Sequence, residues 1–211
     1  MGTRNPLATM RYLPNALTVG RIVLTPVVLF LLTIPTWWGQ MSALLLFIVA
    51  TVSDYLDGQL ARAWNVRSRF GQFLDPLADK VLVLGVFVMF AVLEPDIVPW
   101  WAVALIALRD VGVTALRSYA ESQGRTLATF RIAKSKTAAQ MAFLLALFGV
   151  RVAEHSGPAL QQAAAFLVES HIMYGALIIV VALTVGTGLL YALAPREEVV
   201  SSNPPSSSVS K

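Results

Sequence analysis

The chain has 211 residues, of which 56% are hydrophobic and only 13% are charged. Soluble domains carry about 25% charged residues, so this composition excludes an ordinary soluble domain and predicts a polytopic membrane protein. The sequence has no cysteine, which excludes disulfides, thiolate-bound metals and a cysteine nucleophile. The net charge of +4 is small and is explained by basic residues at one membrane face, so nucleic acid is not an expected partner.

In chain order, the pattern predicts an all-α fold. Residues 1–19 are expected to form a short N-terminal interfacial segment, and residues 20–196 a membrane domain of six transmembrane helices. The tail, residues 197–211, is rich in serine and proline and is expected to be disordered. The six helices are predicted at about 20–38, 41–63, 73–93, 98–119, 137–152 and 172–194.

Basic residues predict the orientation of these helices. The connections near 36–40 and 94–97 contain none, and Arg151 alone lies toward that side. The asymmetry places both termini, and the connections after the second and fourth helices, on the cytoplasmic side of a multi-pass protein of the cell (inner) membrane. The basic residues of the connections after the second and fourth helices are Arg62, Arg67, Arg69, Arg125, Arg131, Lys134 and Lys136.

Four aspartates lie where a membrane helix should be apolar. Asp54 and Asp57 are three residues apart near the end of the second helix, and Asp75 and Asp79 are four apart at the start of the third. Each spacing places both carboxylates on one helix face. Intramembrane acids need a partner or a polar cavity, and oxygen ligands suit hard cations. We therefore predict a site for two Mg²⁺ or Mn²⁺ ions, which could bind a transferring phosphoryl group.

The alternative interpretation is that the aspartates form interhelical salt bridges. Its candidate partners are Arg62, Arg67, Arg69 and Lys80.

The aspartates belong to a longer pattern, D-x2-D-G-x2-A-R-x8-G-x3-D-x3-D. Its fixed positions are all present, as Asp54, Asp57, Gly58, Ala61, Arg62, Gly71, Asp75 and Asp79. In this pattern the sequence resembles the CDP-alcohol phosphotransferase family. The resemblance implies six transmembrane helices, a site on the cytoplasmic side of the lipid bilayer and a homodimer.

Further motifs extend the resemblance over roughly residues 12–150, to family members that use sn-glycerol-3-phosphate as the acceptor. It implies transfer of a phosphatidyl group from CDP-diacylglycerol to that acceptor, with CMP as the leaving group. The matching strings are Leu13-Pro14-Asn15-Ala16-Leu17-Thr18 with Arg21, the run 70–80, Arg109-Asp110, Leu116-Arg117 and Lys134-Ser135-Lys136-Thr137.

The resemblance also implies roles for the motif residues. The four aspartates match the metal ligands, and Asp79 also matches the general base. The residues that match the CDP-binding positions are Asp57, Gly58, Ala61, Arg62, Gly71 and Asp75.

A phosphate-bearing acceptor needs fixed cations. The candidates are Arg109, Arg117, Arg131, Lys134 and Lys136. Arg109 and Asp110 are sequence neighbours on a helix, so we expect them to face different partners. Thr18 and Arg21 are expected to contact lipid headgroup phosphates, or to anchor the interface.

Two alternatives remain open. One is an enzyme of the same family with another acceptor, such as inositol phosphate, serine or phosphatidylglycerol. The other is a cation transporter that uses the intramembrane acids. Transporter sites tend to lie at the midplane between inverted repeats, whereas these acids lie toward one face in adjacent helices, which favours the enzyme.

Overall fold

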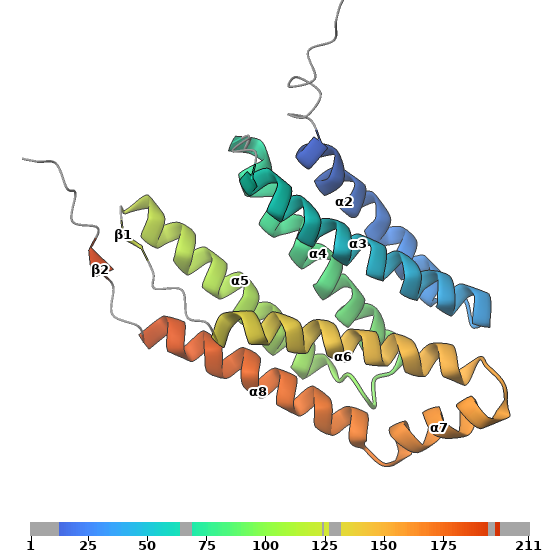
Figure 1. Ribbon diagram of the computed structural model, residues 1–211. Coiled ribbons are helices and arrows are strands. Elements are labelled where there is room, and N and C mark those ends of the chain that lie inside the picture. The colour runs from blue at the N-terminus through green and yellow to red at the C-terminus, as the bar shows by residue number, and fades with distance from the viewer. Residues whose placement is uncertain (1–12, 64–68, 124, 127–131, 194–196, 199–211) are drawn as a thin grey trace, which may run out of the picture.

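The computed structural model describes residues 13–63, 69–123, 125–126, 132–193 and 197–198. It contains α2 (Leu13–Leu32), α3 (Trp37–Ala63), α4 (Arg69–Leu93), α5 (Trp100–Ser122), β1 (Arg125–Thr126), α6 (Ile132–Glu154), α7 (Pro158–Glu169), α8 (Ile172–Leu193) and β2 (Glu197–Glu198) (Figure 1). Within these helices, side chains are not described for residues 13–19, 54–63, 69–79, 117–118, 120–122, 132–135 and 191–192. The described residues confirm the predicted all-α class, apart from one ladder of two-residue strands.

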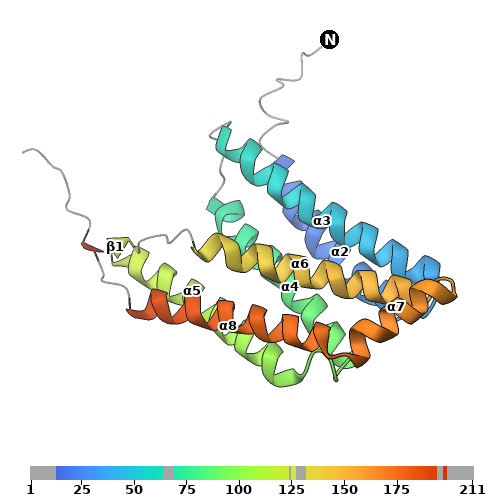
Figure 2. The ribbon, with the colours of Figure 1, turned by 60° about the horizontal axis from the view of Figure 1, so that its bottom comes forward.

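The long helices pack in two groups that α6 joins. α2 packs against both α3 and α4, while α8 packs against α5 and α6. α6 also contacts α3, and α4 contacts α5 (Figures 1 and 2). α7 is a short helix that packs on α6 and α8 at one end of the bundle (Figure 2). Residues far apart in the sequence, on α4, α5, α6 and α8, can therefore meet in the interior.

An aromatic core fills one half of this interior. Phe148 of α6 stacks on Phe47 of α3 at 5.0 Å and meets Phe90 of α4 edge-on at 5.3 Å. Phe143 of α6 stacks on Phe87 of α4 at 6.1 Å. Such pairs contribute about 0.5–1.5 kcal/mol each beyond the burial of their area. They fix α6 against α3 and α4 in the half of the bundle near the end of α4.

The first predicted boundary differs from the structure. The sequence predicted a helix through residue 38, but α2 ends at Leu32 and α3 begins at Trp37. Gln40 Nε2 donates to the carbonyl oxygens of Leu32 at 3.0 Å and Ile34 at 2.7 Å, which satisfies carbonyl groups at the end of α2. A Cβ on Gly39 would lie 2.8 Å from Ile34, so the turn requires a glycine. Hydropathy cannot locate this turn because Trp37 continues the apolar block.

At the N-terminus, residues 13–19 continue without a break into residues 20–32 as α2. Pro14 lies in the first turn, where a missing N–H costs nothing because that group has no intrahelical acceptor. The part of the predicted interfacial segment that precedes residue 13 lies outside the described residues.

Two features at the other connections were not predicted. The first is α7, whose 12 residues are too few to span a bilayer. A helix of this length does not give the long apolar stretch by which membrane spans are recognised. The other is the ladder in which Arg125 pairs with Glu198 and Thr126 with Glu197. Residues 197–198, which the sequence assigned to the disordered tail, are thus paired with the α5–α6 connection. Backbone pairing of this kind leaves no periodic signal in so short a segment.

Arg151, the basic residue on the side with few cations, is neutralised by carboxylates. Its Nη1 lies 2.7 Å from Glu94 Oε1 and 3.2 Å from Glu154 Oε2. Burial raises the pKa of Glu94, and the positive charge of Arg151 opposes that rise. A paired arginine adds little free positive charge to this end of the bundle. The ion pairs therefore agree with the charge asymmetry of the sequence.

The outer surface of the bundle is apolar. Large hydrophobic side chains are exposed on each long helix, for example Phe30, Val49, Val92, Leu108 and Ile179. In the described residues two stretches, 136–154 and 172–190, are long and apolar enough to span a membrane, and 20–32, 37–53 and 80–93 are shorter apolar stretches. Exposed apolar surface on this scale is typical of membrane contact. These observations indicate a membrane protein.

Candidate active site

The aspartate motif lies on two helices. The backbone is helical through Asp54 and Asp57 in α3, and through Asp75 and Asp79 in α4. The spacings of three and four residues therefore place each pair on one helix face, as predicted. Four carboxylates are the donor set that Mg²⁺ or Mn²⁺ prefers, so the residues fit the implied metal. Among the side chains that the structure describes there is no group of three possible metal ligands, and the motif aspartates are not in that set.

The other motif residues also lie on helices, with side chains outside the described part, so their roles stay predictions. They are Thr18 on α2, Gly58, Ala61 and Arg62 on α3, Gly71 on α4, Arg117 on α5 and Lys134 on α6. Arg131 lies outside the described residues.

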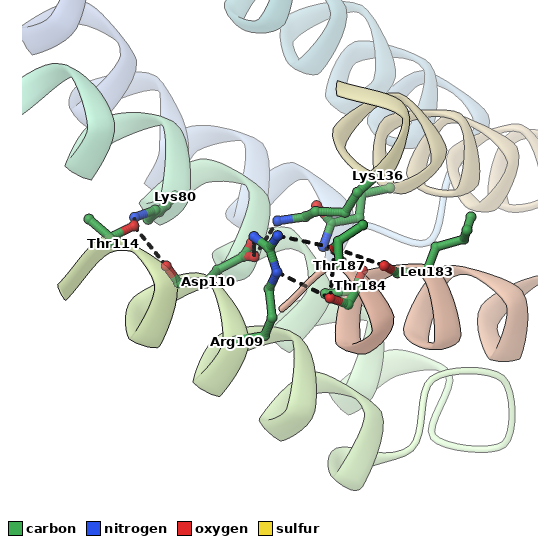
Figure 3. Close-up of polar contacts among 9 residues, drawn as sticks. Lys80, Arg109, Asp110, Thr114, Lys136, Leu183, Thr184 and Thr187 are labelled. Carbon is green, nitrogen blue, oxygen red and sulfur yellow. Dashed lines mark hydrogen bonds and ion pairs between the residues drawn. The ribbon is translucent and has the colours of Figure 1, made fainter. Parts of the chain in front are cut away.

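Polar side chains from four helices form a network in the interior of the bundle (Figure 3). The network includes Lys80, the residue that directly follows Asp79. We call this network the polar cluster. Its members are Lys80 of α4, Arg109, Asp110 and Thr114 of α5, Lys136 and Gln140 of α6, and Thr184 and Thr187 of α8.

The centre of the polar cluster is the ion pair between Lys136 Nζ and Asp110 Oδ1. Asp110 is 7% exposed and Lys136 6%. A buried charge without a partner is strongly destabilising, so this pair makes both charges tolerable inside the bundle. It also holds Lys136, a predicted acceptor-phosphate ligand, at a fixed position between α5 and α6.

Arg109 reaches the same carboxylate from its own helix. Its Nη1 lies 3.3 Å from Asp110 Oδ1, which corrects the prediction that these neighbours would face apart. The long guanidinium stem allows the contact, because it can fold back along the helix surface. Arg109 also has separate partners on α8, since Nε donates to the Thr184 carbonyl oxygen and Nη2 to Thr187 Oγ1, both at 3.1 Å. The two predicted phosphate ligands whose side chains are described therefore converge on one aspartate.

Lys80 connects the motif helix to the polar cluster. Its Nζ donates to Thr114 Oγ1, and that hydroxyl donates to the Asp110 carbonyl oxygen at 2.8 Å. Because Lys80 directly follows Asp79, this chain of contacts sets the position of α4 at the motif relative to α5. The sequence suggested only a salt bridge between Lys80 and the motif aspartates.

Four members of the polar cluster were not predicted: Thr114, Gln140, Thr184 and Thr187. On α8 a signal was present, because Thr184 and Thr187 are three residues apart and share one face of an otherwise apolar segment. Gln140 Nε2 extends this contact by approaching Thr184 Oγ1 at 3.5 Å. Hydrogen bonds of this kind join transmembrane helices when the polar face turns inward.

Arg21 lies on α2, the helix that packs against both motif helices. It is only 4% exposed, and its carbonyl oxygen accepts a hydrogen bond from Thr25 Oγ1 at 2.9 Å. Most of the Arg21 surface is therefore covered by protein. Its contact with lipid headgroups stays a prediction.

The sequence is similar to known proteins over most of its length. The sequence model of the CDP-alcohol phosphatidyltransferase family matches residues 11–186, from α2 into α8. A Bacillus subtilis protein named CDP-diacylglycerol–glycerol-3-phosphate 3-phosphatidyltransferase is 35% identical over 147 residues, 64% of this chain and 75% of its own length. An Escherichia coli K12 protein of the same name is 39% identical over 137 residues, 63% of this chain and 74% of its own. The chain belongs to the CDP-alcohol phosphatidyltransferase family.

Proposed function

We propose that this protein transfers the phosphatidyl group of CDP-diacylglycerol to sn-glycerol-3-phosphate, giving phosphatidylglycerophosphate and CMP. The observation that carries the proposal is the convergence of Arg109 and Lys136 on Asp110, next to the helix that bears Asp79. Two cations from different helices can bind a phosphate dianion by charge-assisted hydrogen bonds. The names of the Bacillus and Escherichia relatives support the choice of acceptor.

The proposed setting is a multi-pass arrangement in the cell membrane, with α2, α3, α4, α5, α6 and α8 as six spans. Their 20 to 27 residues correspond to about 30–40 Å of helix, enough for a hydrocarbon core about 30 Å thick. α5 carries Arg109 and Asp110 at mid-helix, but both are bonded inside the bundle, so its outer face can still contact lipid. The motif end of the bundle is assigned to the cytoplasm from the basic residues of the sequence. The resemblance also implies a homodimer.

The motif end is the proposed donor site. Gly58, Ala61 and Gly71 lack large side chains and would let the CDP moiety approach the helix backbones, where Arg62 supplies positive charge. The four aspartates would hold two Mg²⁺ or Mn²⁺ ions. When bound, such ions neutralise phosphate charge.

The proposed reaction is a direct displacement. The acceptor hydroxyl oxygen forms a bond to the phosphorus that bears diacylglycerol, the bond from that phosphorus to the CMP oxygen breaks, and CMP leaves. Asp79 accepts the hydroxyl proton. Lys136 and Arg109 hold the acceptor phosphate so that the hydroxyl is within reach of the donor, which replaces a bimolecular encounter by a positioned one.

The test is release of CMP from CDP-diacylglycerol by the purified protein in detergent–lipid micelles. We expect release only when a divalent cation and sn-glycerol-3-phosphate are both present. Inositol phosphate, serine and phosphatidylglycerol are assayed in parallel. A preference for one of these would overturn the choice of acceptor, and no CMP release with any acceptor would favour the transporter instead.

Two variants should affect the binding of donor and acceptor differently. Lys136→Gln removes a charge-assisted contact to the acceptor phosphate, worth about 1.5–3 kcal/mol, so the KM for glycerol-3-phosphate should rise roughly 10–150-fold. The KM for CDP-diacylglycerol should change little. Arg62→Ala should show the reverse bias, and each variant is the control for the other in steady-state kinetics. Equal weakening of donor and acceptor by Lys136→Gln would remove Lys136 from the acceptor site.

A further inference from the structure

The side chain of Arg109 passes unusually close to the backbone of α8. A Cβ on Gly188 would lie 2.7 Å from Arg109 Cγ, 3.5 Å from its Nε and 3.7 Å from its Cδ. Gly186, two residues earlier on the same helix, has nothing within 4 Å of its Cβ position. The two glycines of this segment therefore differ, because only Gly188 leaves space that another side chain occupies.

A side chain at position 188 could occupy this space only if Arg109 moved. Cγ is near the root of the side chain, so it can leave a contact of 2.7 Å only by rotation about the first side-chain bond or by a shift of the helix. Either movement would take the guanidinium away from the Thr184 carbonyl oxygen and Thr187 Oγ1.

Movement of Arg109 would also change the candidate acceptor site, which Arg109 and Lys136 form. In the observed position, Arg109 Nη1 contacts Asp110 Oδ1, the same oxygen that Lys136 contacts. The α8 bonds thus fix the arginine, and the arginine and the lysine share one carboxylate. Loss of the α8 contacts would remove two of the hydrogen bonds that hold the direction of Arg109.

We propose that Thr184, Thr187 and Gly188 form a positioning site on α8 that aims Arg109 at the phosphate of the acceptor. The proposal rests on the function proposed above and deepens it, because it makes α8 a determinant of acceptor binding. The family match ends at residue 186, so Gly188 lies just beyond it. The site acts through Arg109 and does not itself touch the substrate.

The experiment compares Gly188→Ala with Gly186→Ala. In Gly188→Ala the KM for glycerol-3-phosphate should rise at least about tenfold, the effect of losing one charge-assisted contact. The KM for CDP-diacylglycerol should stay within about twofold of the parent. Gly186→Ala should leave both constants unchanged. Equal KM values in the two variants, or an equal rise for donor and acceptor in Gly188→Ala, would overturn the proposal.

A double-mutant cycle with Arg109→Ala separates positioning from a general packing defect. If Gly188 acts through Arg109, adding Gly188→Ala to Arg109→Ala should cause no further rise in the acceptor KM. The thermal midpoint of the double variant should also match that of Arg109→Ala, even if Gly188→Ala alone folds poorly. Additive effects would contradict the proposal.

The outcome is distinguishable from a failure of the proposed function. If the parent protein prefers another phosphorylated acceptor, glycerol-3-phosphate is the wrong substrate, and the same comparison is made with the preferred one. If the parent uses only acceptors without a phosphate, both proposals fail. A parent active with glycerol-3-phosphate and insensitive to Gly188→Ala would contradict the positioning role alone.

Discussion

Asp79→Asn is expected to lower the rate of CMP release by roughly 10²–10⁴-fold, the usual worth of a general base, and by more if the carboxylate also binds metal. Asparagine has nearly the shape of aspartate but cannot accept the proton of the acceptor hydroxyl. The following residue, Lys80, is bonded to Thr114 through its own side chain, so we expect the contact between α4 and α5 to survive the change.

The matched control is Asp96→Asn. Asp96 is an exposed carboxylate in the α4–α5 connection, at the end of α4 away from the motif, and its loss should leave the rate unchanged. Size-exclusion chromatography in detergent should give the same profile for both variants and the parent. Activity of Asp79→Asn within a factor of a few of the parent would remove Asp79 from the mechanism.

Removal of divalent cations should abolish CMP release altogether, and Mg²⁺ or Mn²⁺ should restore it. The donor carries a charged diphosphate, and without cations the four aspartates would repel both it and one another. The motif residues fit such ions by their chemistry and by their placement on α3 and α4. Chelation followed by titration of each cation measures the dependence. Full turnover in metal-free buffer would contradict the prediction.

Binding can be measured without turnover. Electron paramagnetic resonance of Mn²⁺ should count about two ions per chain, the number that a phosphoryl-transfer site of this kind holds. Asp57→Asn should lower that count. Glu94→Gln is the control, because Glu94 pairs with Arg151 at the other end of α4, and its loss should leave Mn²⁺ binding unchanged. The same Mn²⁺ count in Asp57→Asn and the parent would remove Asp57 from the metal site.

Hydrophobic blocks and charge were sufficient to predict the class of fold and the long helices. They misplaced the turn between α2 and α3, because Trp37 is as apolar as the helix before it and the turn depends on Gln40 and Gly39. They also gave no sign of α7. Length and hydropathy respond to spans of about 20 residues, and shorter elements need the contacts of the folded chain.

The sequence by itself determined the family and the aspartate motif, because residues at fixed spacing on one helix share a face whatever the helix packs against. The meeting of Arg109, Asp110 and Lys136 with Thr184 and Thr187 was decided only by the tertiary structure. These residues come from three helices, and no local rule sets which helices become neighbours. The packing of α8 against both α5 and α6 does so, together with the space that Gly188 leaves for an arginine.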